Sequence, residues 1–121
     1  MTQYKDYENL LELDGTRFVI DEHLGLWVKF DVTLITPTAH RPHGIRYSLT
    51  LHDRSNQRIM GFDNAHAINY KYRNKGQETY DHVHYYLTAK PSIYIYKNAV
   101  SLLEDFWRAV DQTLLLFRGQ I

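Results

Sequence analysis

The sequence predicts an α+β fold, in which a twisted antiparallel sheet of five or six strands in meander order carries a C-terminal amphipathic helix on one face. Segments that alternate apolar and polar residues follow one another from Arg17 to Tyr96, which is typical of half-buried strands. Turn-forming residues separate these segments at short intervals. From Asn98 to Phe117 the apolar residues take helical spacing, so a helix follows the run of strands.

The composition excludes several classes of protein. A chain of 121 residues with no linker, repeat or low-complexity tract is expected to form one domain, residues 1–121. The absence of cysteine excludes disulfides, thiolate metal sites and thiol catalysis. Fourteen basic residues balance fourteen acidic ones, so any site for a polyanion must be a local patch. Since the chain has no apolar run of roughly 20 residues and no signal peptide, we expect a cytoplasmic protein that does not contact a membrane.

The first half of the chain predicts four strands in a meander. Residues 4–13 have apolar side chains at helical spacing and form either a short helix or an irregular lead-in. The alternation then assigns strands to residues 17–24, 26–35, 45–52 and 58–63. In the second of these, Leu26, Val28, Phe30, Val32 and Leu34 share one face.

Two polar loops and three further elements complete the chain. Residues 36–44 contain two prolines with His40 and His43, which favours an exposed connection rather than a site. Residues 69–79 are polar and basic, as in loops that carry function. Two more strands are expected at residues 80–87 and 92–96. The helix is expected to begin after an Asn98 cap, with Ser101 and Glu104 as an alternative capping box, and to end at Gly119.

The segment around His82 and His84 is the main candidate for chemistry. One residue separates these histidines, so in a strand both rings leave the same face. Without a metal, one imidazole could remove a proton while the other supplies one, as cleavage of RNA through its 2′-hydroxyl requires, with no cofactor. Arg46, Lys29 or Arg73 could then stabilise the charge on phosphorus.

Other interpretations of the same segment stay open. His82 and His84 with His66 and Asp63 could instead be metal ligands. They could also be polar residues on a solvent-facing strand. Asp63 and Asn64 either terminate a strand or orient His66 or His82.

Aromatic residues next to basic ones predict contacts with a polymer. Tyr70, Tyr72 and Tyr80 lie close in sequence to Lys71 and Arg73, and such rings stack on bases. A non-catalytic alternative is a binding module whose tyrosine-rich sheet face docks a protein partner.

Three motifs together resemble a known family. They are Gly44 to Leu51 followed by the Asp53 hairpin and Gly61-Phe62-Asp63-Asn64, then Asp81-His82-Val83-His84, then Leu102-Leu103-Glu104-Asp105-Phe106-Trp107 with Val110-Asp111. In this order they resemble the TumE family of small prokaryotic toxins of toxin-antitoxin pairs. The residues that match the family's pattern are His43, Gly44, Tyr47, Gly61, Asp63, Asn64, Asp81, His82 and His84. Phe62 departs from the tyrosine common in the family, and the segment from Ala65 to Thr79 is longer than the family's usual spacer.

The resemblance implies a toxin of a type II system, with a neighbouring antitoxin that is a helix-turn-helix DNA-binding protein. By analogy with other small toxins it also implies a ribonuclease, with RNA as its substrate. The oligomeric state stays open, a dimer included. The residues expected to be catalytic are His82, His84, Asp81, Asp63, His66 and Arg46, and those expected to bind substrate are Asn64, Tyr47, Lys71, Arg73 and Tyr80.

Overall fold

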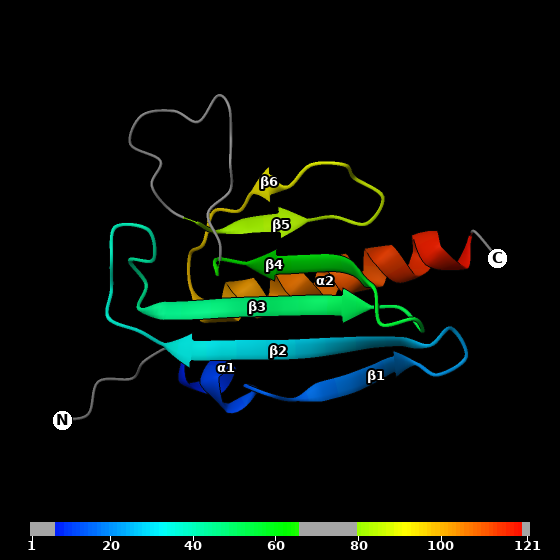
Figure 1. Cartoon of the computed structure of the whole chain (residues 1–121), viewed down its shortest axis with the longest axis horizontal. Helices are drawn as coiled ribbons and strands as arrows, with labels where there is room; N and C mark the ends of the chain where they lie inside the picture. The colour runs from blue at the N-terminus through cyan, green and yellow to red at the C-terminus, as the bar shows by residue number, and fades with distance from the viewer. Residues whose placement is uncertain (1–6, 66–79, 120–121) are drawn as a thin grey trace.

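The computed structural model describes residues 7–65 and 80–119. Six strands form one antiparallel sheet in the order β1-β2-β3-β4-β5-β6, so strands that follow each other in the chain are neighbours in space (Figure 1). The elements are α1 (Glu8–Glu12), β1 (Arg17–Asp21), β2 (Leu26–Leu34), β3 (Ile45–His52), β4 (Arg58–Asp63), β5 (His82–His84), β6 (Ser92–Ile93) and α2 (Ala99–Arg118). The predicted meander with a C-terminal helix is confirmed.

One face of the sheet forms the core against α2. Val28, Phe30 and Val32 alternate with more exposed neighbours along β2, and each is at most 2% exposed. The ring of Phe106 from α2 lies 5.6 Å from that of Phe30 in an edge-to-face contact. Burying an apolar side chain of this size contributes about 1.5–3 kcal/mol. The inward face predicted for β2 is therefore confirmed, except at Leu34, which lies at the end of the strand and is 55% exposed.

The ends of α2 agree with the sequence prediction. The Asn98 side chain accepts a hydrogen bond from the Ser101 backbone N–H at 2.7 Å, so Asn98 is the N-cap. Ser101 lies inside the helix, and the alternative capping box is therefore not formed. Gly119 is the C-cap, with an ordinary right-handed φ of −67°.

Strands β1, β5 and β6 are shorter than the alternation predicts. In β1 the strand ends at Asp21, whose carboxylate accepts a hydrogen bond from the Leu24 N–H at 2.9 Å and turns the chain. After β5, the Thr88 hydroxyl donates to the Tyr85 carbonyl at 2.8 Å, and Leu87 has a positive φ of 66°. Alternation continues in sequence through these turns, but the backbone no longer pairs with the neighbouring strand.

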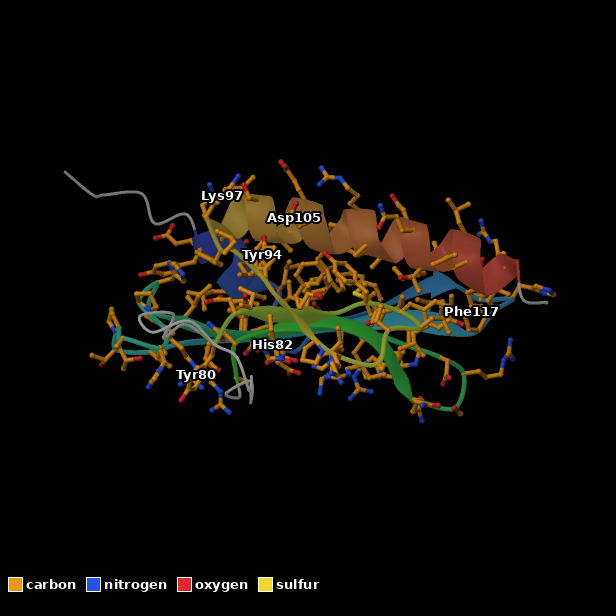
Figure 2. The ribbon with its side chains drawn as sticks, turned by 90° about the horizontal axis from the view of Figure 1, so that it is seen from above. Tyr80, His82, Tyr94, Lys97, Asp105 and Phe117 are labelled. Atoms are coloured by element: carbon orange, nitrogen blue, oxygen red, sulfur yellow. The ribbon has the colours of Figure 1, made fainter. Side chains whose placement is uncertain are left out.

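The other face of the sheet carries the polar residues, and no described helix covers it. Figure 2 shows His82 and Tyr80 on the side away from α2, whereas Tyr94 and Asp105 lie on the helix side. Cross-strand pairing aligns the outward side chains in rows. We call this surface the open face. Its first row is Asp31, Ser48, Asp63 and His82, and its second row is Arg17, Lys29, Thr50, Gly61 and His84. Its third row contains Trp27, His52 and Arg58.

Candidate functional site

His82 and Asp63 are directly opposite each other on β5 and β4. Nε2 of His82 lies 3.4 Å from a carboxylate oxygen of Asp63. The other ring nitrogen, Nδ1, donates a hydrogen bond to the Tyr80 carbonyl oxygen at 2.8 Å. His82 is 4% exposed and Asp63 is 5% exposed. The imidazole is therefore held between two acceptors with little access to water.

This arrangement favours the charged form of His82. A neutral imidazole has a single N–H, so it can donate to only one of the two acceptors, whereas an imidazolium can donate to both. Burial by itself would lower the pKa of His82, but the hydrogen bonds to Asp63 and to the Tyr80 carbonyl outweigh it and raise the pKa above its usual value. The carboxylate at Asp63 is thus the partner that stabilises the proton on Nε2.

The pKa of His84 shifts in the opposite direction to that of His82. Its ring centroid lies 5.1 Å from that of His82, edge to face, and the side chain is half-buried. Burial lowers the pKa of His84, and the nearby Arg58 and His82 charges lower it further. The two histidines therefore differ in the direction of their pKa shifts, which is the pattern of a proton donor beside a proton acceptor.

Arg58, which the sequence analysis did not select, supplies the guanidinium of this site. A Cβ atom placed on Gly61 would lie 3.5 Å from Arg58 Cδ, so the Arg58 side chain crosses β4 over the glycine. The Arg58 charge acts on both His82 and His84. Arg58 and His84 also share the wall of a hollow of about 240 Å³ with Gln57, Ile59 and residues 85–88. Arg46 instead lines another hollow with Asp31 and Ser48.

Asp81 is turned away from His82 toward the helix side of the sheet. One of its carboxylate oxygens accepts a hydrogen bond from the Tyr47 hydroxyl at 2.7 Å. The other lies 4.0 Å from Nε2 of His43. Asp81 is 1% exposed, and burial raises its pKa against the opposing effects of Tyr47 and His43. Asp63 rather than Asp81 is therefore the carboxylate beside His82.

Two of the expected substrate-binding residues are inside the protein. Asn64 is 0% exposed and uses its amide to bridge the chain, accepting from the Tyr47 N–H at 2.8 Å and donating to the Ile45 carbonyl at 2.9 Å. Tyr47 is 1% exposed. Both residues fix the junction of β3 and β4. Tyr80 is partly exposed and stacks on His40, with ring centroids 4.3 Å apart.

The segment between β2 and β3 is more than an exposed connection. The Arg41 guanidinium donates to the Asn64 carbonyl at 2.6 Å and to the Ala65 carbonyl at 2.7 Å, and its Cζ lies 5.0 Å from the Tyr80 ring centroid. It therefore joins the end of β4 to the start of β5. His43 packs against Tyr96, with ring centroids 3.8 Å apart. Residues 36–44 thus form the expected connection between β2 and β3, and Arg41 and His43 within it also contact neighbouring segments.

Several candidates lie outside the described residues. They are His66, Lys71 and Arg73, together with Tyr70 and Tyr72. Within residues 7–65 and 80–119, no group of three His, Asp or Glu side chains is placed to hold a metal ion. No helix in this part of the chain is long and apolar enough to span a bilayer.

The fold and the open-face cluster define a small sheet-and-helix protein with an ionisable site on the uncovered side of its sheet. Residues 9–114 match the family described as Toxin TumE, so the chain belongs to the TumE family of toxins. The resemblance noted from the motifs is thereby confirmed. No curated protein and no solved structure gives a significant match.

Proposed function

We propose that this toxin cleaves RNA by acid-base chemistry at the open face, without a metal ion. His84 is the general base, because its lowered pKa keeps the imidazole neutral and able to accept a proton. His82 is the general acid, because its raised pKa favours the charged imidazolium, which can donate a proton. Arg58, whose charge acts on both rings, stabilises the negative charge that develops on the phosphate.

The proton balance of this reaction can be written with these groups alone. His84 takes the proton of a ribose 2′-hydroxyl, and the 2′-oxygen attacks the adjacent phosphorus. The bond from phosphorus to the 5′-oxygen breaks, which leaves a 2′,3′-cyclic phosphate. The leaving 5′-oxygen takes the Nε2 proton of His82, because the 3.4 Å contact of Nε2 with Asp63 is longer than the 2.8 Å hydrogen bond from Nδ1 to the Tyr80 carbonyl. Return of the proton from His84 to Nε2 of His82 then restores both rings.

The observation that carries this proposal is the opposite direction of the two pKa shifts in rings 5.1 Å apart. Asp63, 3.4 Å from His82, and Arg58, whose charge acts on both rings, are the charged groups that contribute to these shifts. The neutral net charge of the chain is no obstacle, because the charges near these rings are local.

The test is cleavage of a short RNA by purified protein in the presence of EDTA, with the product ends identified by mass spectrometry. His84→Gln is expected to lower the rate about 100-fold or more. His23→Gln is the matched control, since His23 lies on the exposed turn between β1 and β2 and should leave the rate unchanged. No cyclic phosphate product from the wild-type protein, or equal rates in wild type and His84→Gln, would contradict the proposal.

The partner of this toxin is proposed to be an antitoxin encoded nearby, a helix-turn-helix protein, and both would act in the cytoplasm. A groove of about 620 Å³ between α1 and α2 supports a protein partner. Val100 and Trp107, which line it, are 50% and 37% exposed. This groove also favours a second candidate function, a non-catalytic toxin that acts by protein binding. That candidate predicts complex formation with the antitoxin and no turnover of RNA.

A further inference from the structure

An aromatic stack lies on the open face beside the histidine pair. Trp27 and His52 are directly opposite each other on β2 and β3, and their rings are parallel within 12° with centroids 4.2 Å apart. The His52 ring is held by hydrogen bonding, with Nε2 at 2.8 Å from the Thr50 hydroxyl oxygen. Both Trp27 and His52 are half-buried, so each ring is partly exposed to solvent.

Three cations surround this stack. The Arg17 guanidinium lies over the Trp27 ring, with Cζ 5.1 Å from the centroid. The charges of Lys29, Arg17 and Arg58 all act on His52. Two carboxylates offset part of this charge, because Asp31 lies 3.4 Å from Lys29 and the charge of Asp53 interacts with His52. A chain whose total charge is zero therefore gathers positive charge around two stacked rings.

This patch is continuous with the proposed catalytic pair. Lys29 and His84 belong to the same row across the sheet, and Arg58 reaches both the stack and the histidines. Two strand steps of about 4.8 Å from β3 to β5, combined with an offset of two residues (about 6.8 Å) along the strand, separate His52 from His84 by roughly 12 Å. A polymer lying on the stack could therefore reach His84 without leaving the face.

We infer that the Trp27-His52 stack is a base-binding platform for single-stranded RNA, and that Arg17, Lys29 and Arg58 hold the phosphates on either side of it. This inference rests on the proposed function. It adds that the substrate is single-stranded and that it crosses the sheet from the stack toward His84. Single strands suit such a surface because their bases are free to stack on aromatic rings while the cations follow the backbone. Because every base has a face that can stack on an aromatic ring, the platform predicts weak sequence preference.

The two tryptophans of the chain allow a direct test. Trp27 lies on the open face and Trp107 on α2, so Trp107→Phe leaves an emitting residue at the platform and Trp27→Phe leaves one on the helix. Each variant is titrated with a short 2′-O-methyl RNA, which binds but cannot be cleaved through the 2′-oxygen. We expect saturable quenching of Trp27 fluorescence and no change in Trp107 fluorescence.

Affinity measurements by anisotropy of the same labelled RNA provide the second readout. Trp27→Ala is expected to weaken binding about 10-fold or more through lost stacking. Arg17→Gln and Lys29→Gln should each reduce the slope of log affinity against log salt by about 0.7, because one phosphate contact is lost. Lys97→Gln is the matched control, since Lys97 is exposed near the start of α2 on the other side of the molecule (Figure 2).

The outcomes separate this inference from the catalytic proposal. Cleavage of unmodified RNA together with an unresponsive Trp27 would overturn the platform and leave the proposed function standing. Quenching of Trp27 without any cleavage would support the platform and contradict the ribonuclease. Shielding of Trp27 by a protein partner alone, with no response to RNA, would overturn the platform as a nucleic-acid site.

Discussion

In the described part of the chain, two contacts between a histidine and an aspartate differ in how the fold surrounds them. On the open face, His82 lies 3.4 Å from Asp63. On the helix side, His43 lies 4.0 Å from Asp81. Asp81 and His82 are adjacent in sequence, yet the alternation of side chains along the strand sends them to opposite faces. Adjacent residues of the same motif therefore enter different environments.

The two pairs also differ in the groups that surround each carboxylate. Asp81 is hydrogen-bonded by the neutral Tyr47 hydroxyl inside the protein, and burial raises its pKa. Asp63 faces a histidine whose pKa is raised and which has a second histidine beside it. The helix-side pair joins segments of the fold, whereas the open-face pair holds two rings with opposite pKa shifts. We therefore expect substitutions on the helix side to reduce stability and those on the open face to change proton affinity.

The largest expected effect comes from Tyr47→Phe. Removing the Tyr47 hydroxyl leaves a nearly buried carboxylate oxygen of Asp81 without its donor, which should lower the free energy of unfolding by about 1–3 kcal/mol. Urea unfolding at neutral pH measures this change. Tyr94→Phe is the control, because its partner Asp105 is 36% exposed and can be solvated by water. Equal losses in the two variants would mean that Asp81 is less isolated than its burial indicates.

A smaller effect should distinguish the two carboxylates directly. Asp63→Asn removes the charge that stabilises protonated His82, so we expect the pKa of His82 to fall. Asp81→Asn should change the pKa of His82 much less, since Asp81 is oriented toward Tyr47 and His43. Titration of the imidazole C–H signals by NMR measures both. A larger shift from Asp81→Asn would reverse the assignment of the two pairs.

The smallest effect is on the pH dependence of stability. The folded-state pKa of His82 is raised above 6.5, so its contribution is fully present below pH 6.5 and is lost as pH rises through the folded pKa. The pKa of His84 is lowered, so its contribution has the opposite sign and is lost as pH falls. The groups that shift the pKa of His82 are Asp63, the Tyr80 carbonyl and Arg58.

Chemical unfolding at pH 5.5 and pH 8 should therefore show a greater loss of stability in His82→Gln at the lower pH. His84→Gln should show the reverse, with a relative gain at the lower pH. The same sign in both variants would contradict the assignment of one acid and one base.

Much of this architecture was predictable because its signals are local. The inward face of β2 follows from its alternation, and the Asn98 cap follows from residue type at the start of an apolar helical stripe. The closeness of His82 and His84 also follows from their spacing on a strand. The choice of Asp63 over Asp81 and of Arg58 over Arg46 was not predictable in this way. These partners depend on register and on the path of the chain between strands.

The sequence by itself determined the order of the strands, the apolar face that packs on α2 and the side of β5 that carries both histidines, because each depends on periodicity within a few residues. Only the tertiary structure decided which charges meet those histidines. A register shift between Leu51 and His52 places Arg58 opposite His52, although Met60 pairs with Leu51. The extra residue interrupts the alternation of β4, and the Arg58 side chain can then lie across Gly61 toward His84. Such a contact joins residues from three strands, so no local pattern encodes it.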